Sequence, residues 1–143
     1  MNNKQLFLAT ITLLLLTTTA FAGTVEFNIN GVNDDSSKLY VQIFKGEDNY
    51  QNGNAESATI TTSKDGKASI IFNNLDKGDY ALRFFHDQND SGKLEMNLFG
   101  MPVEGYGFSN NAQPNFGPVS YQQIRFSVGE DDGKVINEST VIY

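Results

Sequence analysis

The chain has 143 residues, 17 of them acidic and 10 basic, and its net charge at neutral pH is −7. This length suits one domain. The acidic balance argues against nucleic acid and anionic membrane surfaces as partners, because phosphate groups require a basic surface. With no cysteine and a single histidine, the chain lacks both disulfides and the usual ligands of a zinc site.

The first 22 residues have the pattern of a secretory signal. A start that contains Lys4 precedes an apolar run over 6–16, and the run Ala20-Phe21-Ala22 supplies an A-x-A ending. A membrane anchor is the alternative, but the apolar run has about 11 residues and a bilayer span needs about 20. We therefore predict a signal peptide over 1–22 and one mature domain over 23–143 with no membrane span.

Short alternating runs separated by Gly, Asn and Asp follow the signal. Apolar residues recur at every second position of each run, which is the period of a half-buried strand. Strands are predicted over residues 25–29, 39–43, 58–62, 68–72, 80–86, 124–128 and 135–143. Asp65-Gly66 between the third and fourth runs predicts a tight hairpin turn, because glycine accepts the positive φ that such a turn requires.

About seven short strands in roughly 120 residues, with no helical periodicity, indicate an all-β fold. We expect a two-sheet sandwich of the immunoglobulin or transthyretin type. Two segments interrupt the pattern. The polar stretch 46–57 is predicted as a loop, and the stretch 87–120 is longer than most loops of compact domains. Loops of that length tend to be functional, so site residues are expected in the second stretch.

The first chemical pattern in 87–120 resembles a calcium loop. Oxygen ligands stand at alternating positions, in the side chains of Asp87, Asn89, Ser91 and Glu95 and the carbonyl of Lys93. Gly92 permits the bend that brings such ligands together around a hard cation. The twelfth position, Leu98, lacks the usual bidentate glutamate, so Asp90, Glu104 or water would have to supply a further oxygen. A polar turn in which the side chains bond their own backbone explains the same residues.

The second pattern places aromatic rings between glycines and beside amides. Its candidate ligand-binding residues are Glu104, Tyr106, Phe108, Asn110 and Asn111. Rings offer contact area at low entropic cost and amides offer directional hydrogen bonds, which suits a protein or carbohydrate partner. In the alternative, this loop covers the sandwich and buries Tyr106, Phe108 and Phe116 in the core.

Catalytic patterns are weak in this chain. The single histidine, His86, would need a nucleophile or a metal beside it, and a packed strand residue accounts for it as well. The carboxylates of Asp87, Glu95 and Glu104 suit an acid–base pair as much as a cation site. No serine lies in a nucleophile elbow and no paired-histidine motif is present. We predict no catalytic residue.

Several runs carry a resemblance to a known family: Gly78-Asp79-Tyr80-Ala81, His86-Asp87-Gln88-Asn89, Gly92-Lys93-Leu94, the stretch 100–111, and Phe116-Gly117-Pro118. Together they resemble the exported bacterial proteins named domain of unknown function 2141. The resemblance implies an all-β, extracytoplasmic domain without an established activity, and a periplasmic location. The family's loop usually reads Asn-Gly-Asn-Gly, whereas this chain has Asn89-Asp90-Ser91-Gly92.

These observations favour an exported, non-catalytic binding or structural module. We expect calcium at 87–95 as its stabilising cofactor and the segment 104–118 as its contact surface. Two alternatives belong to other classes: a small hydrolase on a transthyretin-like scaffold, and an accessory subunit of an envelope complex that pairs through an edge strand.

Overall fold

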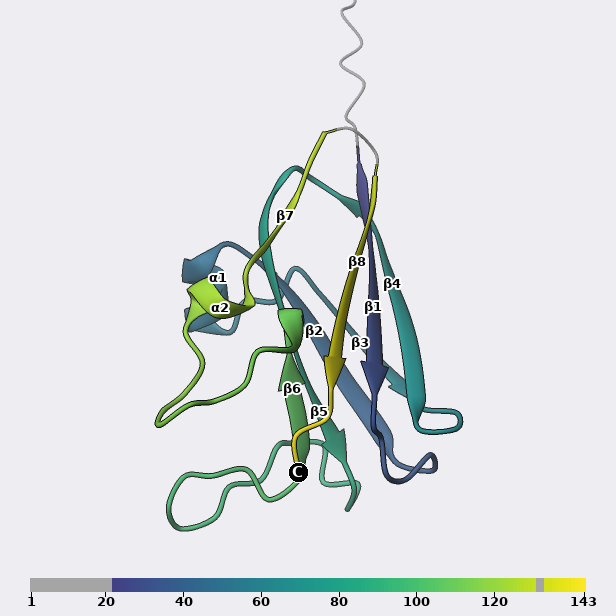
Figure 1. Ribbon diagram of the computed structural model, residues 1–143, viewed down its shortest axis with the longest axis vertical. Coiled ribbons are helices and arrows are strands. Elements are labelled where there is room, and N and C mark those ends of the chain that lie inside the picture. Colours follow the sequence, from purple (N-terminus) through teal and green to yellow (C-terminus); the bar gives the residue numbers. More distant parts are fainter. Residues whose placement is uncertain (1–21, 131–132) are drawn as a thin grey trace, which may run out of the picture.

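The computed structural model describes residues 22–130 and 133–143, so the predicted signal peptide lies outside the described residues except for Ala22. Eight strands occur in this described part: β1 (Gly23–Asn30), β2 (Lys38–Lys45), β3 (Ser57–Thr62), β4 (Lys67–Leu75), β5 (Gly78–Asp87), β6 (Gly105–Phe108), β7 (Phe126–Val128) and β8 (Lys134–Thr140). They form a three-stranded sheet in the order β4-β1-β8 and a five-stranded sheet in the order β3-β2-β5-β6, with β7 paired to β5 (Figure 1). The predicted all-β, two-sheet fold is confirmed.

Several details differ from the prediction. Asp65-Gly66 forms a tight turn in which Lys64 and Lys67 exchange backbone hydrogen bonds, but the strands that it connects, β3 and β4, lie in different sheets, so the predicted hairpin is wrong. The strand β6 was expected to be part of a loop, because its four residues include two glycines, which are depleted in strands. The helix α1 (Glu47–Asn52) lies in the segment predicted as a loop, since six residues are too few to show a helical period. Ile124, predicted to begin a strand, instead ends the short helix α2 (Tyr121–Ile124).

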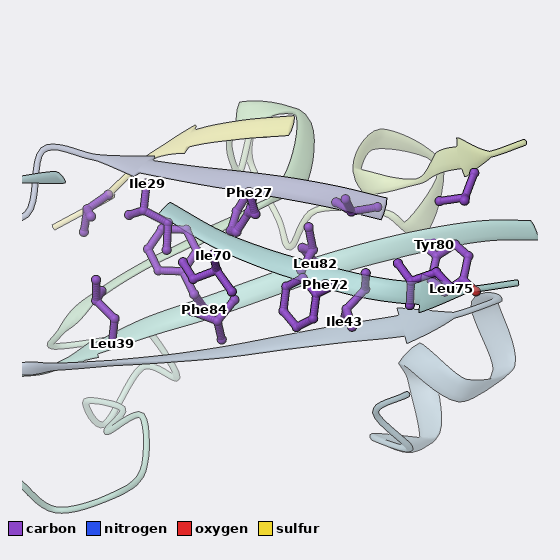
Figure 2. Close-up of a cluster of buried hydrophobic side chains, with 14 of the residues drawn as sticks. Phe27, Ile29, Leu39, Ile43, Ile70, Phe72, Leu75, Tyr80, Leu82 and Phe84 are labelled. Carbon is purple, nitrogen blue, oxygen red and sulfur yellow. The ribbon is translucent and has the colours of Figure 1, made fainter. Parts of the chain in front are cut away.

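The core lies between the two sheets, and the alternation seen in the sequence explains it. Every second residue of β1, β2, β4 and β5 points inward, and these side chains interlock in Figure 2. Phe27 of β1 meets Phe84 of β5 edge-on, with ring centroids 5.8 Å apart. Burial of each such side chain is worth about 1.5–3 kcal/mol, so the core is the main source of stability in a chain without disulfides.

The two helices lie against the outer face of the five-stranded sheet, which is the face turned away from β1, β4 and β8 (Figure 1). A small second cluster forms there, where Ala81 of β5 packs against Tyr121 and Ile124 of α2. Tyr50 of α1 and Phe108 of β6 pack around it. The helices therefore cover only one end of the outer face.

The glycines of β6 determine which way its aromatic residues point. Gly107 pairs with Phe84, and a Cβ atom on Gly107 would lie 2.5 Å from the Phe84 ring. A Cβ atom on Gly105 would lie 2.5 Å from the Tyr143 ring. Only glycine fits this close to the interior, so the alternating residues Tyr106 and Phe108 occupy the outer face.

We predict that Gly107→Ala destabilises the fold by about 1–3 kcal/mol, because the added methyl group overpacks the core against Phe84. Urea unfolding measures the change. Gly117→Ala is the matched control: nothing lies within 4 Å of its Cβ position, so its stability should stay within about 0.5 kcal/mol of wild type or rise slightly. Equal effects of the two changes would show that the contact with Phe84 is unimportant.

Candidate functional site

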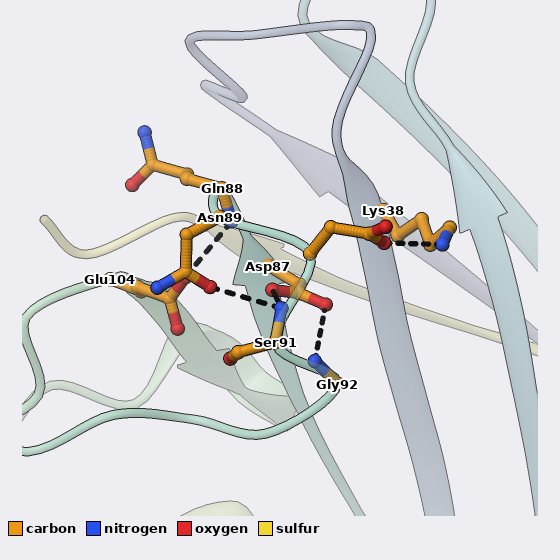
Figure 3. Close-up of polar contacts among 8 residues, drawn as sticks. Lys38, Asp87, Gln88, Asn89, Ser91, Gly92 and Glu104 are labelled. Atoms are coloured by element: carbon orange, nitrogen blue, oxygen red, sulfur yellow. Dashed lines mark hydrogen bonds and ion pairs between the residues drawn. The ribbon is translucent and has the colours of Figure 1, made fainter.

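The predicted calcium loop forms a compact turn directly after β5 (Figure 3). Asp87 is only 2% exposed, and its carboxylate accepts the backbone N–H of Ser91 at 3.0 Å and that of Gly92 at 2.9 Å. The Oδ1 atom of Asn89 accepts the same Ser91 N–H at 3.1 Å. The polar turn considered as the alternative is therefore present.

The turn also gathers the predicted oxygen ligands. Because Asp87 Oδ1 and Asn89 Oδ1 share one N–H donor, the two oxygens converge on one side of the turn. Glu95 Oε2 accepts from Asn89 Nδ2 at 2.9 Å, and Ser91 Oγ donates to the Lys93 carbonyl at 3.0 Å. Within residues 22–130 and 133–143, no group of three or more His, Cys, Asp or Glu side chains is arranged to hold a metal ion.

Glu104 belongs to this turn, although it was predicted as a ligand-binding residue of the aromatic segment. It is 6% exposed and accepts the backbone N–H of Gln88 at 3.0 Å and that of Glu95 at 3.4 Å. Asp90, the other candidate for a further oxygen, instead forms an ion pair with Lys38. The hydrogen bond and charge of Asp90 raise the pKa of Lys38 above its usual value.

Beside the turn, the outer face of the five-stranded sheet contains a hollow of about 420 Å³, which we call the outer hollow. Strand register aligns Tyr40 of β2, Phe85 of β5 and Tyr106 of β6 in one row of its floor. Tyr40 and Phe85 stack with their ring centroids 4.8 Å apart. Leu94, which follows the Asp87 turn, and Tyr50 of α1 also line the hollow.

One cation lines the outer hollow. Arg83 of β5 is half-buried, and its Nε donates to Gln42 Oε1 at 2.9 Å. Its guanidinium carbon lies 4.7 Å from the centroid of the Phe44 ring and 5.7 Å from that of the Tyr50 ring. Burial raises the pKa of Tyr50, although the charge of Arg83 opposes this, so the phenol stays protonated at neutral pH.

A second and larger hollow of about 730 Å³, the loop hollow, lies between the segments 94–102 and 114–119 and the C-terminal residues Ile142 and Tyr143. Most of its lining is apolar: Leu94, Met96, Phe99, Met101, Pro102 and Val119 are among its residues. Tyr106 and Phe108 line both hollows, so β6 lies between them.

The structure separates the predicted ligand-binding residues into groups. Tyr106 and Phe108 reach the hollows, and they are half-buried rather than core residues. Asn110 bonds Asn137 of β8 and the carbonyls of Gln123 and Arg125. Asn111 Oδ1 accepts the Thr140 N–H at 2.9 Å. The two asparagines thus fasten the short helix η1 (Ser109–Asn111) to its neighbours, and a ligand contact for them stays a prediction.

The position of Phe116 tests the alternative in which the aromatic residues of this loop are buried in the core. Its side chain is fully exposed, so the prediction that it packs into the core is wrong. Phe116 lies next to Gly117 and Pro118, both of which line the loop hollow. The bend that contains it has no strand partner, and its own φ is positive, at 56°.

Several lining residues were not predicted as site residues. Tyr40, Gln42, Arg83 and Phe85 sit in regular strands, and only their outward register shows that they belong together. The sequence did contain a signal for this site. β2 and β5 each have an aromatic residue, Tyr40 and Phe85, at a position that strand alternation assigns to the outer face.

His86 is fully buried on the inner face, and both ring nitrogens are bonded. Nε2 lies 3.0 Å from the Asp34 carbonyl, which only accepts, so Nε2 carries the proton. Nδ1 of the neutral ring then accepts the hydroxyl of Tyr143 at 2.8 Å. The same hydroxyl accepts the Asn33 N–H at 3.0 Å. This network leaves neither ring nitrogen for a substrate proton.

We predict that Tyr143→Phe destabilises the protein by about 1–3 kcal/mol, because it leaves the buried His86 Nδ1 without a donor. Chemical unfolding with linear extrapolation gives the value. Tyr40→Phe provides the control, since no hydrogen bond of the Tyr40 hydroxyl to another described residue is found, and its effect should stay within about 0.5 kcal/mol. A Tyr143→Phe protein as stable as wild type would contradict this account.

The turn, the two hollows and the buried histidine together do not identify a reaction. Among the described residues, no helix has both the length and the apolar character needed to cross a membrane. Neither the curated proteins nor the solved structures compared with this chain include a match. One family model does match, over residues 27–136, and its description is an uncharacterised protein conserved in bacteria. Since this match covers most of the chain, the protein belongs to the bacterial family DUF2141.

Proposed function

We propose that this protein is an exported, non-catalytic binding module that takes up its ligand in the outer hollow. The observation that carries the proposal is the arrangement of β6. Its glycines face the core, while Tyr106 and Phe108 line a hollow and keep part of their surface exposed. Half-exposed rings around a concave surface, with a few polar groups among them, are typical of ligand sites.

The lining also favours binding over catalysis. The outer hollow contains the polar side chains of Gln42 and Arg83 and the phenols of three tyrosines, but no carboxylate, serine or histidine. General acid–base chemistry needs a group that exchanges a proton near neutral pH. The single histidine is on the opposite face of β5, where its nitrogens are occupied. No observation favours the hydrolase alternative.

The accessory-subunit alternative would use an edge strand. β3 is at one edge of the five-stranded sheet, and it contains neither a charged residue nor a proline. Such an edge is open to pairing with another strand. Nothing about β3 indicates what would pair with it, so the outer hollow remains the stronger proposal.

The proposal is tested with N-phenyl-1-naphthylamine, a neutral apolar dye whose fluorescence rises in apolar sites. We expect the native protein to bind the dye at one site and Tyr106→Ala to weaken binding about 10-fold, because the ring lines both hollows. Phe116→Ala is the matched control, since Phe116 is fully exposed and lines neither hollow.

Two outcomes would reject the proposal. One is a native protein that binds no dye. The other is equal loss of binding in Tyr106→Ala and Phe116→Ala, which would place the dye on the exposed loops rather than in the hollows. Thermal melts of each variant establish that the fold is intact.

As part of the same proposal, calcium binds the turn at 87–95 and stabilises it. Support comes from the convergence of Asp87 Oδ1 and Asn89 Oδ1 and from the position of Glu95 beside them. Glu104 adds a second buried carboxylate to the turn. A site with so few carboxylates would be weak, with a dissociation constant of about 10⁻⁴–10⁻³ M, which suits an extracytoplasmic module.

We predict that calcium raises the thermal midpoint of the purified protein relative to EDTA, while equal magnesium does not. A tenfold excess of calcium over its dissociation constant should add about 1.4 kcal/mol of stability. Glu95→Gln should remove most of this gain, because glutamine keeps an acceptor for Asn89 Nδ2 and loses the charge. If wild type shows no calcium-specific shift, the turn is stabilised by its own hydrogen bonds alone.

A further inference from the structure

We propose that the ligand is a single-chain anionic amphiphile, a fatty acid. Its carboxylate would bind Arg83 in the outer hollow, and its aliphatic chain would run past Tyr106 and Phe108 into the loop hollow. This inference rests on the proposed binding function and specifies the ligand class. Three observations support it. Arg83 has no carboxylate partner among the described residues, the side chains that line the loop hollow are uncharged and mostly apolar, and the two hollows share lining residues.

Arg83 is half-buried, and no carboxylate of the described residues balances its charge. Among the described residues, no ion pair within 4.0 Å involves Arg83, whereas Arg125, the other arginine, meets Asp79 at 3.1 Å. The hydrogen bond to Gln42 uses only Nε. A guanidinium has five N–H donors in a planar fork that matches a carboxylate. The donors not used by Gln42 are those of Nη1 and Nη2, which together bind a carboxylate end-on.

The side chains around Arg83 strengthen its preference for a carboxylate ligand. Tyr50, Phe44 and Phe85 provide a partly apolar environment, in which a charge-assisted hydrogen bond is stronger than in water. The chain as a whole is acidic, with a net charge of −7. Repulsion from distant carboxylates is screened beyond about 10 Å at ordinary ionic strength, so local contacts with Arg83 decide the affinity for an anion.

The loop hollow differs from the outer hollow, which contains Arg83, because none of the side chains that line the loop hollow is charged. In the sequence, the stretch 96–124 contains a single charged residue, Glu104, and that side chain is buried in the turn. Phe99 is 87% exposed and Met101 is 56% exposed, although both line this hollow. Exposed apolar side chains around an uncharged concavity favour an apolar occupant.

The two hollows meet over β6. Leu94, Met96, Tyr106 and Phe108 line both of them, so a ligand that contacts Arg83 at one end reaches the loop hollow without crossing a polar surface. The volumes of about 420 and 730 Å³ are within the usual range for small-molecule sites. A sugar would leave most of its hydroxyl groups unpaired against this lining, which the loss of hydrogen bonds to water penalises.

The experiment measures displacement of N-phenyl-1-naphthylamine from the full protein at pH 8, where fatty acids are ionised. The competitors are dodecanoate, 1-dodecanol and dodecylamine, below their micellar concentrations. We expect dodecanoate to displace the dye at least about 10-fold more effectively than dodecanol, which is the usual gain from a hydrogen bond to a charged group. Dodecylamine should be the weakest competitor, since its cationic head meets Arg83.

Variants test each end of the ligand separately. Arg83→Met keeps an unbranched side chain over the Phe44 ring and should bring dodecanoate and dodecanol within about twofold of each other, whereas Arg83→Lys should retain part of the preference. Met101→Asp places a charge in the loop hollow at an exposed position. It should weaken dodecanoate more than hexanoate, which is too short to occupy both hollows.

The outcomes distinguish this inference from the proposed function. If the dye binds and Tyr106→Ala weakens it, but dodecanoate and dodecanol compete equally, the fatty acid assignment is wrong and the binding function stands. Stronger competition by dodecylamine, or a dodecanoate preference that persists in Arg83→Met, also overturns the assignment. Binding to phosphatidylglycerol vesicles with no displacement by dodecanoate would indicate a membrane surface and reject the assignment. Absence of dye binding would reject the binding function itself.

Discussion

The close contact between Gly107 and Phe84 is the constraint on which the proposed site depends. A strand that alternates glycine with aromatic residues can pack against a core only through its glycines, and this contact leaves no space for a Cβ atom. The aromatic residues Tyr106 and Phe108 must then face outward. An edge strand that would otherwise add little to the sandwich thereby becomes the wall between the outer hollow and the loop hollow.

The turn at Asp87 has a complementary role. Its buried carboxylate accepts two backbone N–H groups and reverses the chain at the end of β5. The residues that follow, Leu94 and Met96, consequently reach the hollows. Glu104, which directly precedes β6, accepts backbone N–H groups of the same turn. The chain between β5 and β6 is thereby closed at its base. The hydrogen bonds of Asp87 and Glu104 therefore fix the position of Leu94 and Met96 in the hollows. A cation bound at the turn would stabilise this arrangement.

Charge is distributed unevenly in this acidic protein. Three of the ion pairs among the described residues, Lys45–Asp76, Lys77–Glu130 and Arg125–Asp79, are at largely exposed positions, where each contributes at most about 1 kcal/mol. The neighbourhood of β6 is nearly uncharged, and Arg83 is the cation at its margin. Among the described residues, the buried side-chain polar atoms are paired except for the Tyr121 hydroxyl, and His86, for example, bonds Tyr143 and the Asp34 carbonyl. The half-buried Arg83 guanidinium differs from that of Arg125 in having no carboxylate partner among the described residues, and a ligand carboxylate would supply one.

The sequence by itself determined the two-sheet fold, the tight turn at Asp65-Gly66 and most strand positions, because alternation and turn residues act locally. A polar turn at 87–95 was one of two interpretations of the sequence, beside a calcium loop, and the bonds of that turn join near neighbours in the chain. Only the tertiary structure decided which side of β6 faces solvent and that Tyr40, Arg83 and Tyr106 line one hollow. These residues come from three strands, and their proximity depends on strand order and register, which no local pattern encodes. The sequence named Glu104 both beside the aromatic residues and as a possible oxygen for the turn. The tertiary structure decided between the two, because the folding of the long segment brings the backbone groups of the turn to its carboxylate.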